Sequence, residues 1–105
     1  MDYSLNMKVI QTTDVFQAWF DALRDRQAKA LVQARLRRVE LGNFGDCAAV
    51  GEGVSELRIH WGPGYRVYFV QRGLELVVLL AGGDKRTQAR DIQTALELAR
   101  QLKES

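Results

Sequence analysis

The sequence predicts an α+β domain in which an N-terminal helical hairpin and a C-terminal helix pack on a small antiparallel sheet. The chain has 105 residues, the length of one compact domain, and we expect residues 1–105 to form a single domain. All nine glycines and the only proline lie between residues 42 and 83. Because glycine and proline punctuate turns and are unfavourable inside helices, the chain divides into helical ends and a strand-rich middle.

The glycine-free start predicts a short strand and two helices. Residues 7–11 are an extended stretch that is expected to add a strand to the sheet. Asp14 followed by Gln17 has capping-box spacing, and the apolar residues after Asp14 recur at helical intervals. A second helix is expected to begin after Asp25 and to end at Gly42. Its buried face is expected to carry Ala28, Leu31, Val32, Leu36 and Val39.

The middle of the chain predicts three strands joined by tight turns. Residues 54–61 and 65–71 alternate apolar and polar side chains, a pattern typical of a sheet with one buried face. Residues 62–64, Gly-Pro-Gly, are expected to form the turn between them. Residues 74–81 are apolar on both faces, which indicates an interior strand. Thr87 is the predicted N-cap of the final helix, whose apolar face carries Ile92, Ala95, Leu96, Ala99 and Leu102.

The composition excludes several classes of function. One cysteine, Cys47, and one histidine, His60, leave no disulfide framework and no multi-histidine metal centre within one chain. No cofactor-binding fingerprint or nucleophile elbow is present, so we expect no cofactor and no metal. Residues 1–6 lack the features of a secretory signal, and the longest apolar run, residues 76–81, is far below the ~20 residues of a membrane helix. A cytoplasmic protein without membrane association is therefore expected.

Positive charge is concentrated in one half of the chain. Fifteen Lys and Arg residues against thirteen Asp and Glu residues give a net charge of only +2. Between residues 58 and 90, however, six basic residues occur with two acidic ones, so this segment carries +4 and the remainder −2. The six basic residues are Arg58, Arg66, Arg72, Lys85, Arg86 and Arg90.

Most of these bases, with a few other polar residues, are predicted to share one surface. Alternation places polar side chains of two neighbouring strands on the same face of the sheet, and a basic pair precedes the final helix, whose N-terminus favours an anion. The candidate catalytic residues are Arg66, Arg58, Lys85, Arg86, His60 and Glu56. The candidate RNA-binding residues are Arg58, Arg66, Tyr68, Lys85, Arg86 and Arg90. Together they predict a concave, positively charged patch with one carboxylate and one imidazole.

Such a patch suits phosphodiester chemistry. Cleavage of RNA by its own 2′-hydroxyl needs a base, an acid and cations that hold the extra charge on the phosphorus, and it needs no metal. The guanidinium fork binds phosphate in a bidentate manner, which favours Arg58 and Arg66 for the charge-stabilising role.

Structural interpretations of the same residues stay open. Glu56 and Arg58 can form a surface ion pair of little consequence, and His60 can be a structural histidine. Cys47 falls in a predicted loop and is expected to be an inert thiol. The arginines of the second helix are expected on a solvated face; they are Arg35, Arg37 and Arg38.

Three motifs in a fixed order resemble a known family. The first is Glu-Leu-Arg-Ile at 56–59, the second Gly-Pro-Gly-Tyr-Arg-Val-Tyr-Phe at 62–69, and the third Gly-Gly-Asp-Lys-Arg-Thr-Gln at 82–88, followed by Asp91 and Ala95. In this order they resemble the RelE/ParE superfamily of bacterial toxins, most closely the phage-derived addiction-module killer proteins related to HigB. The resemblance covers nearly the whole chain, from Lys8 to Leu102.

The resemblance implies the toxin of a type II toxin–antitoxin system with a RelE-like fold. The implied partner is a small helix-turn-helix antitoxin, with which the toxin forms a hetero-oligomer. For RelE- and HigB-like members the implied activity is an endoribonuclease, or mRNA interferase, that cleaves mRNA in the 30S A site and inhibits growth. Arg66 matches the phosphate-stabilising arginine of the family, Arg58 a second basic position, and Lys85 with Arg86 the basic pair.

The chain also departs from the family pattern. RelE-like enzymes carry lysines where this chain has Ser55 and Glu56, and a tyrosine where it has Ile92. HigB-like enzymes use acidic, tyrosine and histidine groups near the C-terminal end, and in this chain only Asp91 matches one of them. The residues that act as general acid and general base are therefore not identified by the resemblance, and His60 and Glu56 are the candidates for these roles. Two alternatives to an enzyme remain: a ParE-like toxin that inhibits gyrase by binding, and a degenerate member that only binds its antitoxin.

Overall fold

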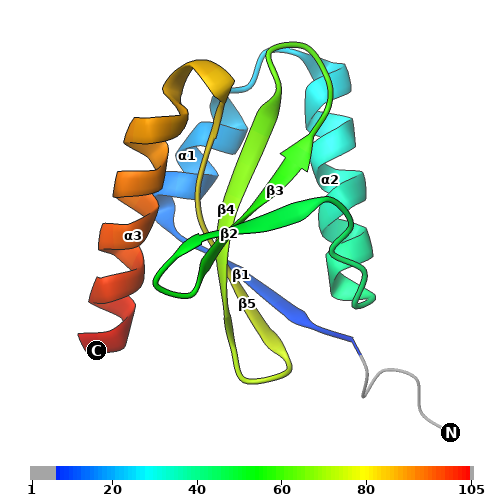
Figure 1. Cartoon of the computed structure of the whole chain (residues 1–105). Coiled ribbons are helices and arrows are strands. Elements are labelled where there is room, and N and C mark those ends of the chain that lie inside the picture. The colour runs from blue at the N-terminus through cyan, green and yellow to red at the C-terminus, as the bar shows by residue number, and fades with distance from the viewer. Residues whose placement is uncertain (1–6, 105) are drawn as a thin grey trace, which may run out of the picture.

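Five strands form one sheet that lies between helices on its two faces (Figure 1). The computed structural model describes residues 7–104; residues 1–6, on which the expectation of no secretory signal rests, lie outside the described part. The elements are β1 (Val9–Thr12), α1 (Asp14–Ala22), α2 (Arg26–Glu40), β2 (Cys47–Gly51), β3 (Val54–Ile59), β4 (Tyr65–Arg72), β5 (Leu76–Asp84), the 3₁₀ turn η2 (Lys85–Thr87) and α3 (Gln88–Glu104). The predicted α+β class is confirmed. Across residues 7–104, no helix is long and apolar enough to cross a bilayer.

The strand order is β1-β5-β4-β3-β2. β3, β4 and β5 form the predicted antiparallel meander, and β5 is an interior strand as its apolar residues on both faces predict. β1 pairs with β5 in parallel, so one edge of the sheet departs from the expected antiparallel arrangement. A parallel pair needs a long connection, and here the segment between β1 and β5 supplies both helices of the hairpin and three strands.

β2 is a strand in a segment where the sequence pattern predicts a loop. Its residues, Cys-Ala-Ala-Val-Gly, include small side chains of weak strand preference and show no apolar alternation. The segment becomes a strand because it pairs with β3, with Cys47 opposite Leu57 and Ala49 opposite Ser55. The prediction for Cys47 was therefore wrong about its backbone, while the side chain is exposed and free.

Helices cover both faces of the sheet, whereas the alternation in β3 and β4 predicts only one buried face. On one face, α1 and α2 enclose a core that includes Phe16, Val32 and Leu57. On the other face, α3 packs over Tyr68 and Leu80. Figure 1 shows α2 and α3 on opposite sides of the sheet. The expectation of a solvated second face was wrong, because α3 lies on it and Glu56, Arg66 and Tyr68 are buried there.

Helix capping differs from the prediction at two of three helices. α1 is capped by Thr13, one residue before the predicted Asp14: the Thr13 hydroxyl accepts from the Phe16 backbone N–H at 3.0 Å. Asp25 caps α2 as predicted. In place of Thr87, Asp84 caps the turn that leads into α3, and its carboxylate accepts from the Arg86 N–H at 2.8 Å.

Replacement of Thr13 by alanine is expected to lower the free energy of unfolding by about 1–2 kcal/mol. The Thr13 hydroxyl both caps α1 and donates to the Leu80 carbonyl at 2.6 Å, so it joins the helix to β5. Urea unfolding followed by circular dichroism measures the change. Thr13→Ser keeps the oxygen and should recover most of the loss. Asp14→Ala is the matched control, expected to change stability by less than about 0.5 kcal/mol; a larger loss there would make Asp14 the cap after all.

Candidate functional site

A cluster of polar residues lies between the sheet and the start of α3. β3 and β4 run antiparallel with Glu56 opposite Tyr68 and Arg58 opposite Arg66, so all four side chains share the face that α3 covers. Gln88, the first residue of α3, reaches the same place and donates to Glu56. We call these five residues the polar cluster. The predicted hairpin therefore brings four of the candidate site residues together.

Glu56 is the centre of the polar cluster. Its side chain is 3% exposed, which excludes the interpretation as part of a surface ion pair. The carboxylate accepts from Arg58 Nε at 3.2 Å and from Gln88 Nε2 at 3.1 and 3.3 Å. Arg66 Nε lies 3.9 Å away. Desolvation of an unpaired carboxylate is strongly unfavourable, so these donors and cations are what allow Glu56 to be buried.

Arg66 lies deeper than the sequence pattern predicts. Its side chain is 6% exposed. Nη1 donates to the carbonyl oxygens of Gly64 at 3.3 Å and Tyr65 at 3.2 Å, while Nε has no hydrogen-bond partner among the described residues. The guanidinium is thus directed at the β3–β4 connection and at Glu56 rather than at solution.

Tyr68 contributes no surface to the predicted patch, since it is completely buried beneath α3. Its hydroxyl makes no hydrogen bond within the described part of the chain. Burial raises the pKa of the Tyr68 hydroxyl, and the nearby carboxylates of Glu56 and Asp91 raise it further. Tyr68 is therefore a neutral member of the polar cluster that packs in the apolar core under α3. A nucleobase cannot stack on it in this arrangement.

His60 lies at the exposed edge of the site and pairs with Asp46, which is not among the predicted site residues. The His60 side chain is 68% exposed, and its Nε2 lies 2.5 Å from Asp46 Oδ2. Asp46 Oδ1 lies 3.7 Å from Arg58 Nη1. The hydrogen bond from His60, and then the charge of Arg58, hold the pKa of the Asp46 carboxyl below its usual range. Asp46 sits in the connection before β2, where no periodic pattern marks a residue as near the site.

The remaining predicted cations form an exposed rim. Lys85, Arg86 and Arg90 are all exposed. Lys85 packs over Gly64, where a Cβ atom would come within 3.1 Å of Lys85 Cγ, so Lys85 adjoins the connection that Arg66 supports. Arg86 pairs with Asp84 at 2.9 Å, and Arg90 Nε lies 3.9 Å from Asp91. The sixth base of the segment is elsewhere: Arg72 donates to the Leu102 carbonyl at 3.1 Å.

Arg35 of α2 is not on a solvated helix face, contrary to the prediction. It is partly buried, and burial is the main cause that lowers its pKa. Nη1 donates to the Arg58 carbonyl at 2.5 Å, and Nη2 donates to those of Phe44 at 2.8 Å and Asp46 at 3.1 Å. Arg37 and Arg38, by contrast, are exposed as expected. Through these hydrogen bonds Arg35 connects β3 with the segment that contains Asp46.

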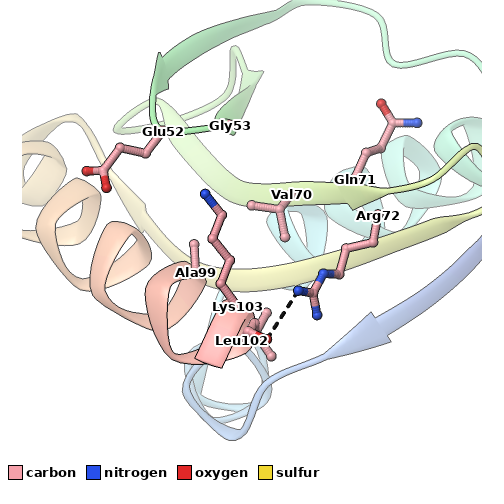
Figure 2. A pocket seen from close by; sticks show the side chains of 8 residues that line it. All are labelled: Glu52, Gly53, Val70, Gln71, Arg72, Ala99, Leu102 and Lys103. Carbon is pink, nitrogen blue, oxygen red and sulfur yellow. Dashed lines mark hydrogen bonds between the residues drawn. The ribbon is translucent and has the colours of Figure 1, made fainter. Parts of the chain in front are cut away.

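A small hollow lies at the other end of α3 and β4 (Figure 2). Val70, Ala99 and Lys103 are among its lining residues, and Arg72 reaches across to the Leu102 carbonyl. Its volume of about 190 Å³ is below the roughly 300–1,000 Å³ of sites that enclose small molecules. None of the predicted site residues lines it. Nowhere in residues 7–104 do three or more His, Cys, Asp or Glu residues gather in a group suited to a metal ion.

The fold and the site define a small α+β protein with a buried carboxylate and exposed cations near the junction of a sheet and a helix. The chain belongs to the Gp49-like phage-derived family: the family described as "Phage derived protein Gp49-like (DUF891)" matches residues 18–104, which include the whole polar cluster and Asp46. This family is of toxin type and is related to the RelE- and HigB-like addiction modules. A Haemophilus influenzae protein named "Uncharacterized protein" is 48% identical over 93 residues, which cover 89% of this chain and 94% of that protein.

Proposed function

We propose that this chain is the toxin of a type II toxin–antitoxin system, in the HigB-like branch of the RelE/ParE superfamily. We further propose that it acts in the bacterial cytoplasm, where it cleaves mRNA in the ribosomal A site. The toxin-type family supports the first part. One observation carries the second: Arg58 and His60, both solvent-exposed in part, converge on the two oxygens of Asp46. A guanidinium beside an imidazole is the minimum equipment for phosphodiester cleavage without a metal.

Arg58 is the phosphate-binding group of this proposal. Its side chain is 38% exposed, and Glu56 and Asp46 hold its guanidinium from two sides. A fixed guanidinium suits a phosphate that gains charge during the reaction, because donors already in place need no reorganisation. Arg66, which the resemblance matches to the phosphate-stabilising position, is buried; we assign it to the support of Glu56 and hence of Arg58. The exposed rim of Lys85, Arg86 and Arg90 follows the RNA backbone.

His60 is the proton-transfer group of this proposal in preference to Glu56. Glu56 is enclosed by Arg58, Arg66 and Gln88, whereas His60 is open to solvent. The neutral imidazole takes the proton of the 2′-hydroxyl while the O2′–P bond forms. The imidazolium then gives a proton to the 5′-oxygen while the P–O5′ bond breaks, so the imidazole returns to its starting state. The products are a 2′,3′-cyclic phosphate and a 5′-hydroxyl.

The cognate partner in this proposal is a helix-turn-helix antitoxin that forms a hetero-oligomer with the toxin. An acidic segment of such a partner that covers Arg58 and Lys85 would neutralise both charge and access. Binding at a distance from the site is the alternative mode, and competition between the antitoxin and a short RNA for the toxin separates the two.

Mapping of mRNA 5′ ends after brief induction, without the antitoxin, tests the proposed activity. We expect cuts within translated messages at preferred codon positions, and fewer cuts in untranslated RNA. Arg58→Ala should lower cleavage about 10²–10³-fold, the loss typical of a removed charge-stabilising group. Arg37→Ala, which removes an exposed arginine from α2, is the matched control and should cut as well as the wild type.

Two other results would replace the proposal with its alternatives. Trapped gyrase–DNA complexes and an SOS response, with uncut mRNA, would identify a ParE-like gyrase inhibitor. Normal growth at full expression without the antitoxin would identify a member that only binds its partner.

A further inference from the structure

Asp46 lies between His60 and Arg58, two side chains of the site that are open to solvent at least in part. One of its carboxylate oxygens lies 2.5 Å from His60 Nε2, and the other lies 3.7 Å from Arg58 Nη1. Arg58 in turn donates to the buried Glu56 through Nε at 3.2 Å. Asp46 therefore completes a continuous series of polar contacts from the solvent-exposed imidazole of His60 to Glu56 in the interior of the polar cluster.

Three hydrogen bonds hold the backbone of residues 45 and 46, so the Asp46 carboxylate lies beside His60 and Arg58 before any substrate binds. The Asp46 carbonyl accepts from the Arg58 N–H at 3.0 Å and from Arg35 Nη2 at 3.1 Å. The neighbouring Gly45 has φ +65, and a Cβ atom there would lie 3.1 Å from Arg35 Nη2. Asn43 Oδ1 accepts from the Gly45 N–H at 3.1 Å. Glycine at 45 thus allows both the turn and the close approach of Arg35.

We propose that Asp46 is the positioning residue of this site: it binds His60 through Nε2, so that Nδ1 is the ring nitrogen that exchanges protons with RNA, and it aligns Arg58 beside it. This inference rests on the proposed ribonuclease function. A carboxylate that accepts from one ring nitrogen selects the tautomer and stabilises the imidazolium once it forms. The titratable and charged groups that face Asp46 are His60 and Arg58 from the sheet side and Arg35 from α2, and Cys47 adjoins it in β2.

The ring nitrogens of His60 report directly on this arrangement. His60 is the only histidine, so its two ¹⁵N resonances are unambiguous in labelled protein. For the neutral ring we expect the tautomer with the proton on Nε2. Asp46→Asn, whose amide both donates and accepts, should give a mixture of tautomers. A change of tautomer is a signature that a purely structural role of Asp46 would not produce.

Kinetics on ribosome-bound mRNA supply the second measurement. Asp46→Asn is expected to lower the single-turnover rate about 10–100-fold, while the toxin concentration for half-maximal rate changes by less than about threefold. Glu52→Gln is the matched control: it removes a carboxylate paired with Arg100 at 2.6 Å, at the far turn between β2 and β3, and should leave both quantities unchanged. Circular dichroism checks that both variants are folded.

Each outcome decides the inference. An unchanged His60 tautomer in Asp46→Asn, or an altered tautomer with an unaltered cleavage rate, overturns the role of Asp46 while the ribonuclease function stands. A wild-type protein that cuts no ribosome-bound mRNA overturns the proposed function and this inference with it. An altered tautomer together with a loss confined to the rate supports both.

Discussion

Replacement of Arg66 by alanine is expected to lower the free energy of unfolding by about 3 kcal/mol and, because Glu56 and hence Arg58 lose their support, to abolish growth arrest. The substitution removes one of the two cations near the buried Glu56, and it removes the hydrogen bonds from Arg66 to the carbonyls of Gly64 and Tyr65. A buried carboxylate that loses a counter-charge is destabilising well beyond the value of one neutral hydrogen bond. Urea unfolding of the purified variant measures the loss.

A second substitution separates this explanation from direct contact between Arg66 and RNA. Adding Glu56→Gln to Arg66→Ala removes a buried charge that has lost one of its two counter-charges, so about 1 kcal/mol or more should be regained. Arg90→Ala is the control for loss of an exposed arginine, and its effect on stability should stay within about 0.5 kcal/mol. If Arg66→Ala is as stable as the wild type yet does not cleave RNA, Arg66 acts on the substrate and our supporting role for it is wrong.

Replacement of Gly82 by alanine is expected to lower the free energy of unfolding by about 3 kcal/mol, at the upper end of overpacking effects. A Cβ atom at Gly82 would lie 2.1 Å from Trp19 Cε3 and 2.3 Å from Cδ2, far inside van der Waals contact. The Trp19 ring cannot retreat freely, because it packs between Phe16 and Tyr65 at ring-centroid distances of 5.7 and 6.3 Å. Chemical denaturation of the variant gives the loss.

A double-mutant cycle attributes that loss to the tryptophan. Trp19→Leu shortens the side chain opposite Gly82, so the same glycine substitution should be less harmful in the Trp19→Leu background than in the wild type. We expect a coupling of about 1 kcal/mol or more between the two changes. If the two substitutions have strictly additive effects on stability, the added Cβ at residue 82 does not act through Trp19. The close approach of β5 to α1 would then need another explanation.

Local patterns predicted most elements because each depends on neighbours in the chain. Helical spacing located α1, α2 and α3, and alternation located β3 and β4. β2 escaped prediction because its small side chains form a strand only against β3. The cap of α1 moved to Thr13 because that hydroxyl also bonds to β5, a contact that short-range spacing does not contain.

The candidate site, too, was predictable in part: local patterns predict which residues share a face, but not how deeply they are buried. The alternation of Glu56 and Arg58 with apolar residues placed them on one face together with Arg66 and Tyr68, and the cross-strand register confirms it. The depth of the site was not predictable, since α3 covers that face and changes Glu56 from an exposed to an enclosed carboxylate. Asp46 gave no signal because it lies in a connection without periodicity.

By itself, the sequence determined the class of fold, the types of charged groups and the face of the sheet on which they lie. These properties follow from spacing along the chain, which sets the direction of each side chain within its own element. Only the tertiary structure decided which groups are buried and which are open, because burial depends on elements far apart in the sequence. α3 encloses Glu56 and Tyr68, and Arg35 of α2 brings Asp46 to His60 and Arg58, the contact on which the proposed chemistry depends.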